Sequence, residues 1–539
     1  MTEPDSNRPA ADASAVQRRE FLGSAALSGG GIAAGGLSFW YTHQNTARPD
    51  LDKFSLVEHQ VRTGHIGVGN RGGSLLRTAL QAPGSMPLAV CDKQPEKLRD
   101  SKKKIEEVIE KRDGKNGKPN VRVYDDYRRL LDDKEIEAVI IATPHYLHGE
   151  MAIDAIEAGK HVYCEKALAF TIGENQDIVR LVEDPTCRAV DARTGRPSGR
   201  LVFQVGHQRH YSPLYQRVGH MVETDQIGDV ASIRAQWNLN DAISRPAPSI
   251  EMERVINWRL YSEYSGGLTT EYATHQIDVA NWYFGTHPHS VCGYGGVDWY
   301  IDDARDTHDN IHLVFTYRVP VVERHRFTGR PLRGADGRPI YRQGPDEKPL
   351  MRTTTFDYMS TMANAFLGPS EIIFGRYGTI QLSLAGGEFW KEKKALSDPY
   401  RIAEGTNPRR AQQKSLLKSG ISKAVSLRPE PGELLDEPAL EGGKQHWSRF
   451  IEPIEGAYDK IETLLAVESF LKCVRRSRQG EDFEQELKAT ARVGMESAVA
   501  ALMANIAMRE NRTVFWREFF PAEVAAAGAP RGGGVEGGG

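Results

Sequence analysis

The sequence has few cysteines, and their spacing forms no recognisable motif. Five occur in 539 residues: Cys91, Cys164, Cys187, Cys292 and Cys473. An odd number at wide spacings, with no C-x-x-C pair, argues against a disulfide framework and against a structural zinc site. We expect most of these thiols to be small apolar side chains of the core.

Positive charge is not in excess either. Lys and Arg number 69 against 72 Asp and Glu, so the net charge is −3. Nucleic-acid-binding domains usually carry a clear basic excess, so we predict no nucleic-acid partner. The sequence is 40% hydrophobic and 26% charged, as in soluble globular proteins. At about 150 residues per domain, the length gives a first estimate of roughly three to four domains.

Several catalytic motifs are absent. The sequence has no G-x-S-x-G elbow, P-loop or H-E-x-x-H, which argues against serine hydrolases, P-loop NTPases and zincin proteases. His145 and His148 form an H-x-x-H pair near Glu150. No third ligand follows at a known interval, so we predict no metal site.

A strongly apolar segment is missing from the N-terminus. Residues 22–41 carry no charge and are long enough to span a bilayer, but six of the twenty are glycine. Arg18 and Arg19 stand just before Phe21 and Leu22, which resembles a twin-arginine export signal. We therefore predict an export signal over 1–45 and a periplasmic protein. Because no clean A-x-A cleavage site follows, an uncleaved, membrane-tethered form stays open.

A glycine fingerprint follows the first strand-like run. Gly67, Gly69 and Gly72 form G-x-G-x-x-G, a helix-like segment follows, and a second strand ends at Asp92, twenty residues beyond Gly72. This order is that of a βαβ unit whose helix N-terminus holds a pyrophosphate. Asp92 would accept hydrogen bonds from the adenosine ribose and repel a 2′-phosphate. Since no arginine occurs in the next six residues, NAD is favoured over NADP.

The rest of the chain predicts two domains of the α/β class. Strands alternating with helices over 60–210 predict a doubly wound parallel sheet. Period-2 runs after residue 229 predict a large mixed or antiparallel sheet in a second domain, 211–515. Within that domain the insertion 319–358 is rich in Arg, Gly and Pro; a solvated loop, a β-hairpin at the cleft and an oligomer contact are all compatible with it. Residues 528–539 form a flexible glycine-rich tail.

Three ordered motifs carry a family resemblance. They are TPHYLHGE at 143–150, AGKHVYCEK at 158–166 and GGLTTEYATHQID at 266–278. With the glycine fingerprint they resemble the glucose–fructose oxidoreductase / inositol dehydrogenase / MocA (Gfo/Idh/MocA) family over residues 60–315. The resemblance implies a Rossmann domain, a second domain with an open sheet, and a homo-oligomer. It also implies NAD(P)-dependent chemistry at a carbinol carbon of a sugar, inositol or similar polyol.

The resemblance also implies catalytic residues. His275 would be the general base, because an imidazole titrates near neutral pH. Lys166 would stabilise the developing alkoxide. Glu271 lies one helical turn before His275 and would orient the imidazole or bind a substrate hydroxyl.

Further contacts follow from the same resemblance. The cofactor-binding set is Gly67, Gly69, Asn70, Arg71, Gly72, Asp92, Thr143, Pro144, His145, His148, Glu165 and Lys166. The residues that fall where family members line the substrate cleft are His207, Arg209, Tyr211, Trp258 and Arg259. Each member of the second set is as compatible with packing as with substrate contact.

Two positions depart from the family pattern. Ala167 follows Lys166 where the family usually has proline, and Glu271 stands where it usually has aspartate. A non-proline cis bond costs about 2.5–4 kcal/mol, so we expect a trans peptide here. These two departures keep open a catalytically silent sugar-binding module as an alternative to an exported dehydrogenase. The family resemblance leaves a further alternative, an NAD-dependent glycoside hydrolase that works by oxidation, elimination and re-reduction.

Overall fold

The computed structural model describes residues 60–113, 120–191, 194–326, 329–383, 386–391, 425–426 and 457–521. The predicted export signal and the glycine-rich tail lie outside these residues. In the part of the chain that is described, no helix combines the length and apolarity needed to cross a membrane.

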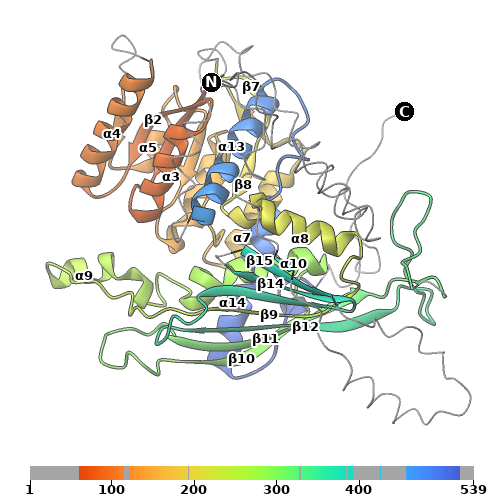
Figure 1. Cartoon of the computed structure of the whole chain (residues 1–539). Helices are drawn as coiled ribbons and strands as arrows, with labels where there is room; N and C mark the ends of the chain where they lie inside the picture. Colours follow the sequence, from red (N-terminus) through yellow and green to blue (C-terminus); the bar gives the residue numbers. More distant parts are fainter. Residues whose placement is uncertain are drawn as a thin grey trace, which may run out of the picture.

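The first domain is built on a six-stranded sheet with all strands parallel, in the order β3-β2-β1-β4-β5-β8. The central strands β4 and β5 are buried at every position because helices cover both faces (Figure 1). The predicted doubly wound sheet is confirmed. Its strands are β1 (Val61–Ile66), β2 (Ser85–Cys91), β3 (Arg122–Tyr124), β4 (Ala138–Ile141), β5 (His161–Cys164) and β8 (Phe203–Val205). Its helices are α3 (Asn70–Gln81), α4 (Pro95–Asp113), α5 (Tyr127–Leu131), α6 (His148–Glu157) and α7 (Ile172–Glu183).

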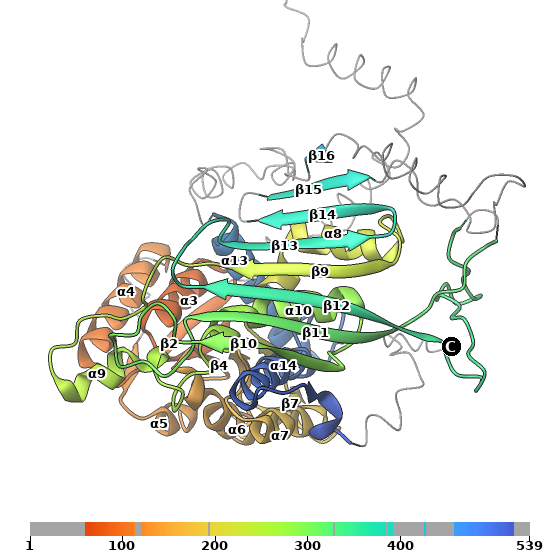
Figure 2. The ribbon, with the colours of Figure 1, turned by 90° about the horizontal axis from the view of Figure 1, so that it is seen from below.

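The second domain is built on a nine-stranded sheet, in the order β16-β15-β14-β13-β9-β12-β11-β10-β17. The pair β9–β12 is parallel and the others are antiparallel, so the predicted mixed sheet is confirmed. The strands are β9 (Val230–Trp237), β10 (Ser290–Gly296), β11 (Asn310–Pro320), β12 (Met351–Thr361), β13 (Pro369–Gly375), β14 (Gly378–Ser383), β15 (Gly386–Lys391), β16 (Val425–Ser426) and β17 (Val514–Phe515). Figure 2 looks onto one face of this sheet, and α8 (Pro213–Glu223) and α10 (Thr274–Phe284) lie behind it.

Two C-terminal helices join the domains. The helix α13 (Ala457–Arg478) returns to the first domain, where Phe470 packs with Leu75 and Tyr163 in one buried cluster. The helix α14 (Ala491–Glu510) packs against α7, α10 and β10 and so lies between the two sheets. The sequence-based division at residue 210 assigned α13 to the second domain, because the apolar face of a helix does not indicate which sheet will cover it.

The segment between β11 and β12 forms a series of short bridged turns. Its bridges include Val322 with Tyr341 and Arg333 with Pro339. Arg324 anchors its base by ion pairs to Asp225 and Asp229, at 2.8 and 2.7 Å. The predicted insertion 319–358 is therefore shorter, because β11 runs through Pro320 and β12 begins at Met351. It projects from the end of the sheet rather than over the cofactor loop (Figure 2).

The remaining described elements are short. One of them is a hairpin in which β6 and β7 run antiparallel and Arg188 pairs with Arg200. The elements are β6 (Arg188–Val190), β7 (Pro197–Arg200), α9 (Ile250–Ile256), the 3₁₀ helices η3 (His145–Leu147), η4 (Gln208–Tyr211), η5 (Trp258–Leu260) and η7 (Trp516–Glu518), and the π-helical turn η6 (Thr269–Ala273).

Candidate active site

The glycine fingerprint forms a tight turn between β1 and α3. Gly67 has φ +82°, and a Cβ there would lie 2.7 Å from the carbonyl oxygen of Ala142. A Cβ on Gly72 would lie 1.9 Å from the carbonyl oxygen of Gly67, whereas one on Gly69 would meet nothing within 4 Å. The first and third glycines are thus required by the protein's own packing. The second leaves an open surface that a ligand can approach.

The residues present fit a dinucleotide. No side chain caps the N-terminus of α3 at Gly69, so the first N–H groups of this helix are available to a pyrophosphate. Asp92 accepts hydrogen bonds from Val68 N and Gln94 N, both at 2.9 Å, through different carboxylate oxygens. Each oxygen keeps a further lone pair for a ribose hydroxyl.

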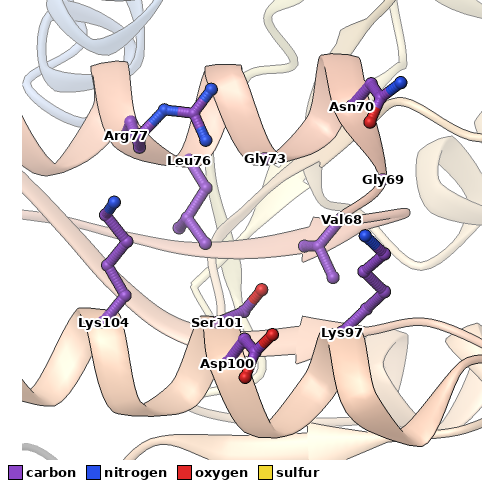
Figure 3. A pocket seen from close by; sticks show the side chains of 10 residues that line it. All are labelled: Val68, Gly69, Asn70, Gly73, Leu76, Arg77, Lys97, Asp100, Ser101 and Lys104. Atoms are coloured by element: carbon purple, nitrogen blue, oxygen red, sulfur yellow. The ribbon is translucent and has the colours of Figure 1, made fainter.

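A cavity of about 490 Å³ opens between α3 and α4 beside the glycine loop (Figure 3). Arg77, Lys97 and Lys104 line it with one acid, Asp100, which makes this end of the site positive and suited to phosphates. Sequence reasoning missed these residues, because a charged helical face is usually only solvated. The complete lining is Val68, Gly69, Asn70, Gly73, Leu76, Arg77, Lys97, Asp100, Ser101 and Lys104.

Arg71 connects the cofactor loop to distant segments. Its Nε donates to Glu165 Oε1 at 2.8 Å, and its Nη2 donates to Gln208 Oε1 at 2.7 Å. Its Nη1 also donates to Thr463 Oγ1 of α13 at 3.3 Å. The predicted cofactor residues Arg71 and Glu165 therefore bind each other in this structure. Their contact with the cofactor itself stays a prediction.

Lys166 lies just past the carboxyl end of β5 and meets Glu271. Its Nζ donates to the backbone carbonyl of Glu271. Burial lowers the pKa of Lys166 below its usual value, although the nearby carboxylates oppose this. The peptide between Lys166 and Ala167 is cis, so the expectation of a trans bond is wrong. The carbonyl oxygen of Ala167 lies 2.9 Å from Nδ1 of the buried His148, which fixes the loop in this position.

Glu271 lies in the π-helical turn η6 rather than in a regular α-helix. Its Oε2 accepts a hydrogen bond from Arg259 Nε at 2.9 Å, and the Arg259 guanidinium stacks on Trp258, 4.3 Å from the ring centre. Burial acts to raise the pKa of Glu271, but the charges of Arg259 and Lys166 outweigh it and hold the pKa below its usual value. The carboxylate is thus ionised and held by Arg259, and π-helical turns are frequent at functional sites.

His275 is in the second position of α10 and faces aromatic rings. Its ring centre lies 5.4 Å from that of Trp237 and 6.3 Å from that of His207. Burial, followed by the positive charges of Lys166 and Arg209, holds the pKa of His275 well below its usual value. The imidazole is therefore neutral at physiological pH, which is the form that a general base needs.

Of the predicted contacts in the loop after β4, His145 and His148 are buried, whereas Thr143 and Pro144 are half-buried. His148 Nε2 lies 3.0 Å from the carbonyl oxygen of Thr143, so this side chain bridges two backbone segments. The ring of His145, which follows Pro144, packs edge-on against Phe170 at 5.4 Å. Burial is the main reason that its pKa falls to about 3. The described residues contain no group of three or more His, Cys, Asp or Glu side chains arranged to hold a metal.

The five predicted substrate contacts do not form one cluster. His207 lies beside His275, and Arg259 and Trp258 lie beside Glu271. Arg209 is instead buried in an ion pair with Glu371 of β13. Tyr211 lies further away, where its hydroxyl accepts hydrogen bonds from the backbone N–H groups of residues 488 and 489, each at 3.2 Å.

Sequence reasoning missed several packed aromatic side chains near the site. Trp237 at the end of β9 packs against both His275 and Tyr272, with the ring of Tyr272 at 5.2 Å. Tyr146 and Tyr264 pack together at 5.0 Å. The only signal in the sequence was that Tyr272 lies inside the motif that carries Glu271 and His275.

A parallel sheet with a glycine cradle, beside which a lysine, a carboxylate and a neutral histidine converge, defines the class of nicotinamide-dependent oxidoreductases. Residues 61–191 match the family described as "Oxidoreductase family, NAD-binding Rossmann fold". Residues 215–322 match the "GFO/IDH/MocA C-terminal domain". These two segments are thus similar to the Gfo/Idh/MocA family, and the predicted NAD-binding Rossmann fold is confirmed over the first of them.

Curated relatives match part of the chain. Levoglucosan dehydrogenase of Pseudarthrobacter phenanthrenivorans is 32% identical over 161 residues, 30% of this chain and 36% of the relative. Inositol 2-dehydrogenase of Salmonella typhimurium is 26% identical over 224 residues, 41% of this chain and 54% of the relative. The matched segments thus span about a third to a half of these relatives.

Solved structures share the fold over most of the chain. Levoglucosan dehydrogenase in complex with NADH and levoglucosan has a TM-score of 0.54 at 19% identity, covering 85% of this chain and 99% of the other. Scyllo-inositol dehydrogenase from Lactobacillus casei, with bound NAD(H) and scyllo-inositol, has a TM-score of 0.51 at 18% identity, covering 85% and 99%. The predicted fold class is therefore confirmed.

Proposed function

We propose that the chain is an NAD-dependent oxidoreductase that transfers a hydride between nicotinamide and a carbinol carbon of a sugar, inositol or glycoside. The observation that carries this proposal is the arrangement just past the carboxyl end of β5, where Lys166 binds the backbone of Glu271 and its charge acts on the buried His275. Ligands of such sheets bind at this end. The names of the relatives, levoglucosan dehydrogenase and inositol 2-dehydrogenase, support the substrate class.

The side chains present suit alcohol oxidation. When bound, NAD supplies the acceptor for the hydride that leaves the carbon. The neutral His275 accepts the proton of the hydroxyl oxygen. The Lys166 ammonium binds the Glu271 carbonyl in this structure. One of its N–H groups donates to the substrate hydroxyl oxygen and stabilises the negative charge that develops there.

Glu271 contributes differently from the sequence-based expectation. Its carboxylate is held by Arg259 and no hydrogen bond joins it to His275 in the described structure. We therefore assign it to a substrate hydroxyl rather than to the orientation of the imidazole. Arg259 keeps the carboxylate ionised, so that Glu271 accepts this hydrogen bond as a charged group.

We also propose that the enzyme is exported by the twin-arginine route. The support is the Arg18-Arg19 motif, which lies outside the described residues. Replacing both arginines with lysine in a chain fused to an export reporter should retain the protein in the cytoplasm. Unchanged export of the double variant would contradict the proposal.

A homo-oligomer is the proposed assembly. In Figure 2 no helix of the described residues crosses the near face of the nine-stranded sheet, and such a face is where a second copy can pack. Light scattering on the purified chain should give at least twice its 60.0 kDa mass. A single-chain mass at micromolar concentration would contradict this.

A glycoside hydrolase is the second candidate function. One relative, a "Glycosyl hydrolase family 109 protein" of Saccharopolyspora erythraea, is 31% identical over 171 residues, 30% of this chain and 36% of the relative. Oxidation of a sugar carbon followed by elimination and re-reduction would use the same three residues. The two functions differ in their products, because the hydrolase releases aglycone with no net NADH.

One experiment separates the candidates. Purified protein is tested for bound NAD(H) and then incubated with NAD and a panel of sugars, inositols and p-nitrophenyl glycosides. A rise in absorbance at 340 nm supports the dehydrogenase, and release of p-nitrophenol without that rise supports the hydrolase. Sugar binding without either signal would leave the silent binding module as the explanation, and absence of NAD binding would refute the cofactor site.

A further inference from the structure

Two buried polar atoms face each other behind His275 without a hydrogen bond. His207 Nδ1 and Asp278 Oδ2 lie 3.6 Å apart, with side-chain exposures of 0% and 2%. Neither atom has a hydrogen-bond partner. Buried polar atoms are nearly always paired, so two orphaned atoms at the same place indicate a missing shared partner.

The neighbours fix which atom carries the imidazole proton. His207 Nε2 lies 2.8 Å from Ser497 Oγ, which also lies 3.0 Å from the carbonyl oxygen of Gly494. The serine hydroxyl donates its hydrogen to a backbone carbonyl, so it accepts from His207 Nε2–H. A neutral His207 therefore presents the lone pair of Nδ1 to the Asp278 carboxylate, and a proton between them would create an N–H···O bond.

We propose that His207 and Asp278 form a proton-binding site whose occupancy sets the strength of His275 as a base. The site rests on the proposed function, because it acts through the base. Asp278 follows His275 by three residues on α10, one helical turn away. The His207 and His275 rings meet edge to face at 6.3 Å, so a charge on one acts directly on the other.

Titratable or charged groups from three other segments face this pair, and a neutral hydroxyl comes from a fourth. From η4, His210 places its Nε2 3.0 Å from the other carboxylate oxygen of Asp278. Arg209, also on η4, is neutralised by Glu371 of β13. Lys166 and Glu165, which follow β5, also act on His207 with opposite signs. From α14, the neutral hydroxyl of Ser497 contacts His207, and the same helix carries the buried carboxyl of Glu496.

The direction of the coupling follows from these contacts. Burial is the largest effect on His207 and lowers its pKa despite Asp278. Burial also acts to raise the pKa of Asp278, but His207 and His210 hold it below its usual value. At neutral pH the pair is therefore deprotonated, with a negative Asp278 behind His275. As the pH falls, the pair binds a proton, the negative charge is cancelled, and His275 becomes a weaker base.

The pH dependence of kcat/KM in the full chain tests the proposal. A proton on the pair opposes a proton on His275, so the acid limb of wild type should fall in two separated steps with an overall slope below tenfold per pH unit, whereas a single protonation gives about tenfold. His207→Gln, which can still reach Ser497, and His207→Asn, which still offers a donor to Asp278, should both fall tenfold. The matched control His289→Gln removes the histidine just before β10, which contacts Phe515, and should keep the two-step limb of wild type.

Asp278→Asn gives an independent check of the sign. It removes the negative charge behind His275, so the remaining single-proton limb should move to lower pH by about one unit. The two His207 variants keep the proposal testable if this variant does not fold. A two-step limb that persists in the His207 variants, or a single tenfold limb in wild type, would overturn the proposal.

A readout that needs no turnover separates this proposal from the proposed function. Ring ¹⁵N NMR of the full chain with labelled histidine should show one buried imidazole that is protonated at Nε2 at pH 8 and gains an Nδ1 proton on acidification. This resonance should be missing in His207→Gln. If the resonance is present and no substrate turns over, the proposed function fails and the proton site stands. Turnover without the resonance gives the reverse result.

Discussion

The two ends of the site are built from different parts of the chain. At the cofactor end, backbone geometry is decisive: Gly67 and Gly72 have no room for a Cβ, and Gly69 leaves an open surface. At the catalytic end, side-chain charges are decisive: Lys166, Glu271 and Arg259 hold one another across loops far apart in sequence. A backbone cradle tolerates many side chains around it, whereas a charge cluster depends on each member.

His275→Ala should have the largest effect and should separate the two ends. Loss of a general base typically lowers turnover by about 10²–10⁴-fold, and nothing in the glycine cradle touches this side chain. NAD affinity, measured by fluorescence titration, should therefore change less than twofold while kcat falls. A large loss of NAD affinity would show that the two ends are one cooperative unit.

The same contrast explains what could be predicted from the sequence. The glycine loop and its strands are local, so spacing alone placed Gly67, Gly69, Gly72 and Asp92 correctly around one turn. The regular periodicity of the strands likewise predicted both sheets.

Long-range pairing was not predictable. The sequence does not state that Glu371 of β13 neutralises Arg209, or that Thr463 of α13 reaches Arg71. Nor does helical spacing reveal the π-helical turn at Glu271, which sends this carboxylate to Arg259 instead of His275. These features depend on which elements meet in three dimensions, and local sequence patterns carry little of that information.

Glu371→Gln should have the largest effect on stability. It removes the charge that pairs with the buried Arg209 and also accepts from the Tyr215 hydroxyl at 2.9 Å. Breaking one partner of a buried pair typically costs about 3–5 kcal/mol. The exposed pair of Asp241 with Arg245 is the matched control, and Asp241→Asn should cost less than about 1 kcal/mol. Urea unfolding of both variants measures the difference, and equal costs would refute the assigned role of burial.

At the cofactor end, Gly72→Ala and Gly69→Ala should separate an effect on stability from an effect on NAD binding. A Cβ on Gly72 must displace the backbone of Gly67, which should cost about 1–3 kcal/mol of stability and weaken NAD binding. A Cβ on Gly69 meets no protein atom, so Gly69→Ala should keep wild-type stability and weaken only NAD binding. Thermal unfolding with and without NAD tests both variants. Unchanged NAD affinity in Gly69→Ala would show that the cofactor does not approach this surface.

Lys166→Arg should give the smallest change, a reduced rate together with a shift in the alkaline pH limb. Lys166 must be protonated to stabilise an alkoxide, and burial lowers its pKa below the usual 10.5. Activity of wild type should therefore fall as the pH rises through this lowered pKa, below 10.5. Arginine stays charged over this range, so the variant, although slower because its planar head fits the site differently, should keep its residual kcat/KM constant to higher pH. An alkaline limb at the same pH in both enzymes would assign that limb to another group, and the catalytic end would then depend on one charge fewer than its geometry suggests.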